Sequence, residues 1–197
     1  ASSLEDAGLY FAWGDTIGYT AEQVTNGEKK FASDWSDYFD TTDGGSTFNK
    51  YNNIGGLAVL EVADDAATIN MGLNYRMPTS VDWHELINNT TITYVDIYNN
   101  EHDPVIVYGM FNEGELLGVK FTGSNGNSIF IPAGGQAINS SVENYGSDTL
   151  LWEPNIIVHD SNSYNANYAN FNLNGEIMMG TENIRYIGLP VRGVCSK

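Results

Sequence analysis

The sequence has a single cysteine, Cys195, and few basic residues. One cysteine excludes an internal disulfide and a zinc site built from cysteines. The 197 residues include 8 Lys and Arg against 25 Asp and Glu, which gives a formal net charge of −17. This leaves too little positive charge to neutralise a run of nucleic-acid phosphates or to hold an anionic lipid surface. We therefore expect no nucleic-acid partner.

The chain also lacks a long hydrophobic run. No stretch approaches the ~20 apolar residues that a membrane-spanning helix needs, so we expect no membrane insertion. Hydrophobic residues nevertheless make up 42% of the chain and aromatic residues 12%, which is too rich for disorder despite the charge. The length fits one domain, which we place over residues 8–197, after a linker or flexible N-terminus at residues 1–7.

Composition also bears on the location of the protein. Asn, Gly, Ser and Tyr are frequent and Lys is scarce, which is typical of secreted or displayed proteins. Small secreted domains of eukaryotes usually carry disulfides, and a single cysteine argues against that setting. The chain opens at Ala1 without Met, which indicates processing or excision from something longer. We expect an extracellular location, on a bacterial cell surface or a virion.

Two helices are predicted in the first half of the chain. Apolar spacing favours a helix over residues 57–72, stopped by Gly72. A second helix begins after an N-cap at Thr79 or Ser80 and ends at Asn89. Two early helices followed by short antiparallel strands predict an α+β fold.

Strand patterns dominate the second half, and residues 15–54 are predicted as a long loop because they show no regular pattern. Trp13, Trp83 and Trp152 stand in apolar runs and are predicted to lie in the core. The predicted strands cover residues 8–14, 91–98, 105–111, 116–122, 128–131, 150–158, 168–173, 176–179 and 189–194.

Catalytic motifs are missing from the sequence. There is no G-x-S-x-G elbow, phosphate-binding loop or dinucleotide fingerprint. His84-Glu85 begins like a zinc-protease helix, but Asn88 stands where the second histidine is needed. His102 and His159 have no partner at a recurrent ligand spacing. We therefore predict no catalytic residue and no cofactor.

Two acidic features leave calcium as an alternative. The densest acidic cluster consists of Asp34, Asp37, Asp40 and Asp43, although its spacing is not that of an EF-hand. Glu153-Pro154-Asn155 matches the sugar-binding tripeptide of animal C-type lectins, in which a carboxylate and an amide ligate calcium and bond sugar hydroxyls. Neither feature gives a complete ligand set, so we predict no metal site. A calcium-dependent carbohydrate-binding domain stays open as the alternative.

The segment 160–174 has the composition of a binding loop. Tyrosine gives a large contact area at low entropic cost, and Ser and Asn give adaptable hydrogen bonds. Side chains alternate along a strand with a period of two, which places Phe171 and Leu173 toward the core and the asparagines outward. The alternative is a solvated edge hairpin in which asparagines stabilise turns. The predicted binding residues are Tyr164, Asn165, Asn167, Tyr168, Asn170 and Asn172.

Several short sequence motifs occur in an order that resembles a known protein family. They include Tyr10-Phe11-Ala12-Trp13-Gly14-Asp15, Arg76-Met77-Pro78-Thr79, Asn127-Ser128-Ile129-Phe130-Ile131-Pro132-Ala133-Gly134 and Gly188-Leu189-Pro190-Val191-Arg192-Gly193-Val194. Together they resemble the major paralogous domain abbreviated FISUMP, found in surface and secreted proteins of anaerobic bacteria and their phages. The resemblance spans residues 8–194.

That family is similar to the formylglycine-generating-enzyme and C-type-lectin-like superfamily. The resemblance implies a C-type-lectin-like fold, with two helices packed on short, mostly antiparallel strands and with paired N- and C-terminal strands. The generating enzyme needs a catalytic cysteine pair, which one cysteine cannot supply. Phage tail and bacterial surface proteins of the superfamily carry their recognition residues near the C-terminus, and some are diversified variable proteins.

The resemblance therefore implies a non-catalytic ligand- or receptor-recognition module on a bacterial surface or phage tail fibre. Its expected partner is a host or bacterial surface protein or a glycan, and a homo-oligomer is compatible with this role. A second alternative is a structural fibre or pilus-tip adhesion domain without a small ligand.

Overall fold

The structure is a computed structural model that describes residues 6–32, 50–52, 57–156 and 165–195. The acidic cluster at Asp34–Asp43 and the predicted binding residue Tyr164 lie outside these ranges. The helices are α1 (Ala21–Thr25), α2 (Ala66–Met71) and α3 (Ser80–Asn89), with the 3-10 helix η3 (Pro104–Ile106). Helices and mostly antiparallel strands confirm the predicted α+β class. No helix in the described ranges is long and apolar enough to cross a membrane.

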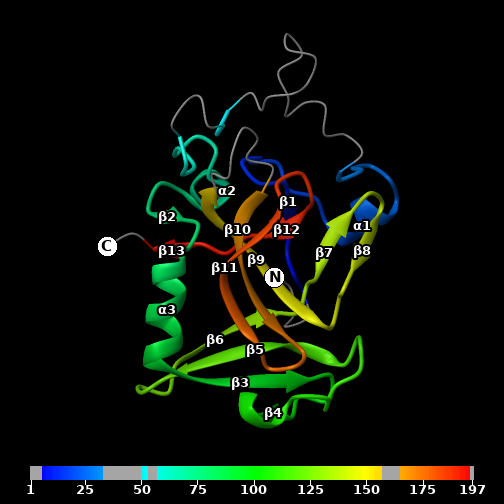
Figure 1. The fold of residues 1–197 in the computed structure, drawn as a ribbon, viewed down its shortest axis with the longest axis vertical. Helices are drawn as coiled ribbons and strands as arrows, with labels where there is room; N and C mark the ends of the chain where they lie inside the picture. The colour runs from blue at the N-terminus through cyan, green and yellow to red at the C-terminus, as the bar shows by residue number, and fades with distance from the viewer. Residues whose placement is uncertain (1–5, 33–49, 53–56, 157–164, 196–197) are drawn as a thin grey trace.

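Two sheets form the frame of the molecule (Figure 1). The four-stranded sheet has the order β4-β3-β5-β6, with β3 (Thr90–Asp96), β4 (Glu101–His102), β5 (Leu116–Gly123) and β6 (Ser128–Pro132). The three-stranded sheet has the order β11-β10-β9, with β9 (Asp148–Ile156), β10 (Asn165–Asn172) and β11 (Ile177–Ile184). In Figure 1 the first sheet lies at the lower end, and the second rises from it beside α3.

Three short strand pairs complete the fold. They join β1 (Tyr10–Phe11) to β12 (Leu189–Pro190), β2 (Tyr75–Arg76) to β13 (Val194–Cys195), and β7 (Gln136–Ile138) to β8 (Ser141–Glu143). The antiparallel pairing of β1 with β12 confirms the expectation that strands from the two ends of the chain pair. The predicted closing strand over 189–194 forms as two short strands, β12 and β13.

The core lies on both faces of the three-stranded sheet. On one face, Trp83 of α3 and Phe121 of β5 pack edge-on against Phe171 of β10, with ring centroids 5.8 and 5.3 Å apart. On the other face, Trp13 and Trp152 belong to a second cluster that includes Leu189 of β12. All three predicted core tryptophans are buried, which confirms that prediction.

The helix that follows β2 forms where the sequence predicts it. Thr79 is the N-cap of α3, and the Thr79 and Asp82 side chains form a capping box. The helix ends at Asn89, as expected. Gly72, at a φ of 105°, ends α2 in a conformation that few residues other than glycine adopt.

The helix predicted over residues 57–72 is wrong in its first half. Asp65 accepts a hydrogen bond from the Thr68 N–H at 2.9 Å, and this N-cap begins α2 only at Ala66. Residues 58–60 instead run beside β9, where the Leu60 N–H donates to the Pro154 carbonyl. Contacts with a strand distant in sequence thus override the local helical spacing.

The predicted strand over residues 105–111 is also wrong. Asp103 accepts a hydrogen bond from the Val105 N–H at 2.8 Å, and Pro104 at the first helical position favours η3 instead. Helix α1 was missed inside the predicted loop over residues 15–54, although Thr20 and Gln23 form a capping box there.

Candidate functional site

The predicted binding residues of β10 do not form an exposed row. Asn170 and Asn172 are only 6% and 9% exposed, so the prediction that these asparagines point outward is wrong. Asn165, Asn167 and Tyr168 are half-buried. Phe171 and Leu173 do pack against the core, as the period of two predicts.

Strand order explains the burial of these asparagines. β10 is the central strand of its sheet, flanked by β9 and β11 rather than lying at an edge. Tyr168 faces one core cluster and Phe171 faces the other, so neither face of β10 is open to solvent along its length. Over residues 169–172, the second half of this strand, the side chains on both faces are buried.

Asn172 has a structural role of its own. Its Nδ2 donates to Glu176 Oε2 at 2.7 Å, and its Oδ1 accepts from the Asn174 and Glu176 N–H groups at 3.0 and 3.1 Å. These bonds hold the turn between β10 and β11. Asn172 therefore behaves as the alternative interpretation expected, as an asparagine that stabilises a turn.

Glu153 of the Glu153-Pro154-Asn155 tripeptide is inside the protein. Its side chain is fully buried, and its Oε1 accepts from the Gly180 N–H at 3.3 Å. Burial raises the pKa of the Glu153 carboxyl, against the opposing effect of Gly180, Asn167 and Ser80. A carboxyl so placed does not meet a sugar at the surface, which removes this route to the calcium-dependent alternative.

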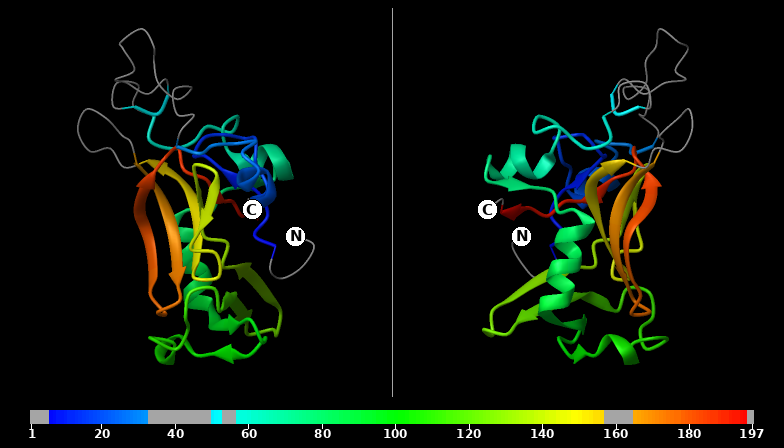
Figure 2. Two further views of the ribbon diagram at one scale, coloured as in Figure 1. Left: turned by 90° about the vertical axis from the view of Figure 1, so that its right-hand side faces the viewer. Right: turned by 60° about the vertical axis from the view of Figure 1, so that its left-hand side comes forward.

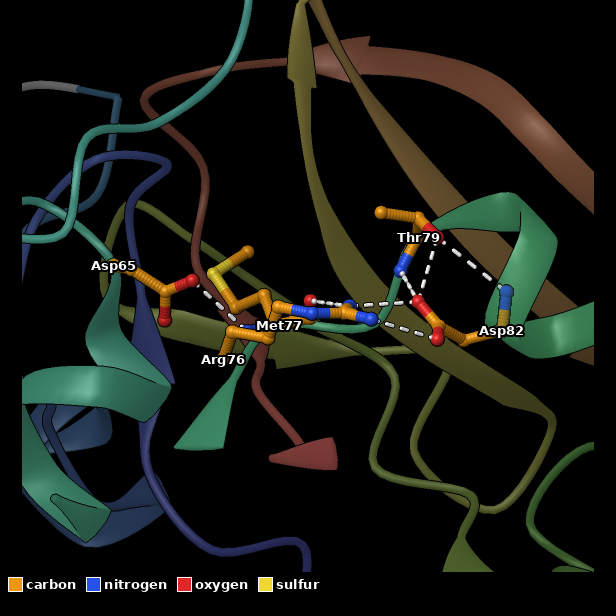
Figure 3. A network of polar contacts seen from close by, with 5 residues as sticks. All are labelled: Asp65, Arg76, Met77, Thr79 and Asp82. Atoms are coloured by element: carbon orange, nitrogen blue, oxygen red, sulfur yellow. Dashed lines mark hydrogen bonds and ion pairs between the residues drawn. The ribbon is translucent and has the colours of Figure 1, made fainter. Parts of the chain in front are cut away.

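Polar contacts order the chain from α2 to α3 (Figure 3). The Arg76 guanidinium donates to both carboxylate oxygens of Asp82, at 2.7 and 2.8 Å, and the Thr79 hydroxyl donates to Asp82 at 2.6 Å. The hydrogen bonds from Arg76 hold the pKa of Asp82 well below its usual range. Asp65 accepts from the Met77 N–H at 2.9 Å, which ties α2 to the same extended link. In the described ranges no group of three His, Cys, Asp or Glu residues is placed to hold a metal ion.

The surface that stands out is built from the turn between β3 and β4, from η3 and from the turn that follows η3. Tyr98, Val105 and Tyr108 are 76%, 87% and 79% exposed, which is unusual for side chains of this size and apolarity. Ile97 and Ile106 are also exposed. We call these five residues the 97–108 surface; they belong to the lower end of the molecule in Figure 1, where β3 and β4 lie.

Asp96 fixes the turn that carries Tyr98. Its carboxylate accepts hydrogen bonds from the Tyr98 and Asn100 N–H groups at 2.8 and 2.9 Å and from Asn100 Nδ2 at 2.9 Å, and it contacts His102 Nε2 at 3.0 Å. Burial raises the pKa of Asp96, but the hydrogen bonds from Asn100, His102 and Tyr98 outweigh it and hold that pKa well below its ordinary value. The turn is therefore organised before any partner arrives.

Close packing fixes the second half of the surface. Val107 is fully buried between the exposed Ile106 and Tyr108, so it anchors the segment to the core. Gly175, at a φ of 79°, lies so close that an added Cβ would meet the Pro104 carbonyl oxygen at 2.4 Å. The turn after β10 thus packs directly against the backbone of η3.

The sequence does not predict this surface because residues 105–111 are rich in apolar and aromatic residues that are typical of strands. The signal that could have found it is Asp103-Pro104, since Asp is a preferred N-cap and Pro is favoured at the first helical position.

No protein-family model matches the chain. No curated protein matches it, and no solved structure does.

Proposed function

We propose that the protein is a non-catalytic recognition module with a C-type-lectin-like fold, displayed on a bacterial surface or a virion. The paired end strands, the helix α3 on a short-stranded sheet and the mixed α+β composition support the fold. The excess of acidic over basic residues and the lack of catalytic motifs in the sequence support a binding role outside the cell.

The observation that carries the proposal is the 97–108 surface. Tyr98 and Tyr108 offer large, rigid contact areas at low entropic cost, and Val105 lies between them in sequence with most of its side chain in solvent. Because Asp96 and Val107 already fix the backbone on either side, little ordering opposes binding. Aliphatic side chains next to tyrosines favour a protein surface over a glycan as the partner.

The proposal departs from the sequence prediction in its choice of residues. Asn170 and Asn172 are buried, so the asparagine row of β10 offers no continuous surface to a macromolecule. Asn165 is the first residue of β10, and its Nδ2 donates a hydrogen bond to Glu182 Oε2 at 3.0 Å. The recognition role is therefore assigned to the 97–108 surface rather than to β10.

A binding experiment on intact cells tests this assignment. The variant Tyr98→Ser, Val105→Ser, Tyr108→Ser removes the exposed apolar surface without touching the core. The matched control is Val62→Ser, Leu73→Ser, Val81→Ser, which removes comparably exposed apolar side chains elsewhere. Fluorescently labelled protein is incubated with a panel of bacterial and host cells and measured by flow cytometry.

We expect the first variant to lose cell binding and the control to keep it. Protease treatment of the cells is expected to abolish binding, whereas periodate oxidation of their glycans leaves it unchanged. Sensitivity to periodate alone would identify a glycan partner. Equal binding by both folded variants would refute the assignment, and dimerisation that disappears only in the first variant would identify the surface as a contact between copies of the chain.

A further inference from the structure

A pocket of about 300 Å³ lies where α3 meets β6 and the segment before β13. The right-hand view of Figure 2 brings α3 forward, with the red C-terminal strand near its upper end. Apolar side chains form most of its wall, chiefly Trp83, Leu86 and Ile131. The volume lies at the lower end of the range of roughly 300–1,000 Å³ that small-molecule sites occupy.

Arg192 lines this pocket and forms no ion pair with the described residues. Its Nε is buried and has no hydrogen-bond partner among the described residues. Within those residues no carboxylate lies at ion-pair distance from its guanidinium, and Asp6 exerts only a longer-range attraction. Burial lowers the pKa of Arg192 because its charge is poorly solvated there. In a protein with a net charge of −17, a half-buried cation that no described carboxylate pairs with is unexpected.

Trp83 lines the same pocket and differs from the other two buried tryptophans of the described ranges. Its side chain is buried and lines the pocket, and its indole N–H makes no hydrogen bond in the described part of the chain. The buried indoles of Trp13 and Trp152 differ, since each donates to a backbone carbonyl at 2.8 Å. Buried donors without partners are uncommon and require an explanation.

The carboxylate of Asp82 also lines the pocket, but Arg76 and Thr79 already engage it. The Arg76 guanidinium therefore neutralises the negative charge of Asp82. Among the described residues that line the pocket, Arg192 then supplies one positive charge that no carboxylate engages, which matches a monoanion. A dianion such as a phosphate monoester would bring a second negative charge close to Asp82 with no cation to meet it.

We propose that this pocket binds a monocarboxylate carried on a compact apolar group. The carboxylate accepts hydrogen bonds from the Arg192 guanidinium, and the apolar group packs against Trp83, Leu86 and Ile131. A peptide that ends in an apolar residue and a free aromatic or aliphatic acid share this chemistry. The site is built from residues other than the 97–108 surface, so it stands independently of the recognition role proposed above.

Nuclear magnetic resonance of the ¹⁵N-labelled protein tests the proposal through its tryptophan indole signals. The probes are 3-phenylpropionate and N-acetyl-L-phenylalanine, each compared with its uncharged amide and with phenyl phosphate. Trp83→Phe assigns the Trp83 indole signal. We expect the two carboxylates to shift this signal while the signals of Trp13 and Trp152 stay in place, and tighter binding of N-acetyl-L-phenylalanine would identify a peptide C-terminus as the source.

The amides and phenyl phosphate are expected to bind about tenfold more weakly, because a hydrogen bond to a charged group is lost or a charge is left unpaired. Arg192→Gln should weaken carboxylate binding by a similar factor and leave the amides unaffected, while Arg192→Lys keeps part of the attraction. Lys30→Gln, which removes an exposed lysine elsewhere, is the control for net charge. An unmoved Trp83 signal, equal shifts from acids and amides, or full binding by a folded Arg192→Gln variant would overturn the proposal.

Discussion

Trp13 and Trp152 each donate the indole N–H to a backbone carbonyl that lies close in sequence to the other tryptophan. Trp13 Nε1 donates to the Glu153 carbonyl, and Trp152 Nε1 donates to the Phe11 carbonyl, both at 2.8 Å. The two bonds join the N-terminal strand to β9 across most of the sequence. They also satisfy polar groups in a region where water does not enter, since both tryptophans are buried.

We expect Trp13→Phe and Trp152→Phe each to lower the free energy of unfolding by about 1–3 kcal/mol, because each leaves a buried carbonyl without its donor. Trp83→Phe is the matched control, since the Trp83 indole N–H has no partner in the described ranges. Urea unfolding followed by circular dichroism measures all three. A loss for Trp83→Phe as large as for the other two would show that ring packing, not hydrogen bonding, sets the cost.

Asn172→Ala is expected to lower stability by about 1–2 kcal/mol, because the turn after β10 loses the bonds to Glu176 and Asn174. Asn174→Ala, at the neighbouring turn position, takes part only through its backbone N–H in these bonds and should cost less. Chemical denaturation provides the comparison. Unchanged stability of Asn172→Ala together with lost cell binding would return the recognition role to β10.

The Asp96 carboxyl makes stability depend on acidity. Its pKa in the folded protein lies below its ordinary value of about 3.9, so its contribution is complete above that value and is lost as the pH falls. We expect Asp96→Asn to flatten the decline of the melting temperature between about pH 4 and pH 2 and to lower the melting temperature at pH 7. Asp103→Asn, which removes a nearby exposed carboxylate, controls for charge. A decline as steep in Asp96→Asn as in the unmodified protein would contradict this.

Glu153 should act in the opposite direction. Burial raises the pKa of its carboxyl above the unfolded value of about 4.3, so its contribution is present at low pH and is lost as the pH rises through the folded pKa. Glu153→Gln removes the ionisation and keeps the shape, so we expect it to raise the melting temperature near pH 8 relative to pH 4. Thermal melts across this range provide the measurement. A variant less stable at pH 8 than the unmodified protein would show that the buried charge is favourable.

The sequence predicts the local structure correctly where the deciding residues lie close together in the chain. Thr79 caps α3 through Asp82, three residues later, and Gly72 ends α2 through its own backbone conformation. The aromatic character of the run around Trp13 likewise identified a buried strand. In each case the residues that determine the local structure lie within one helical turn or one strand of each other.

The errors arise where distant segments decide the outcome. Residues 58–60 have helical spacing, but β9 holds them extended through the Pro154 carbonyl. β10 was predicted as a candidate binding strand because nothing local shows that β11 and β9 flank it on both sides. The exposed position of Tyr108 depends equally on the burial of its neighbour Val107, which the sequence pattern does not reveal.

The pairing of β1 with β12 also constrains the synthesis of the protein. Tyr10 and Phe11 pair with Pro190 and Leu189, residues from opposite ends of the sequence. Until residues 189–190 have left the ribosome, the edge of β1 that pairs with β12 stays open, although Tyr10 can already pair with Tyr19. The β1–β12 pair closes only after those residues emerge, so a chain truncated before Leu189 should aggregate rather than form a smaller stable domain.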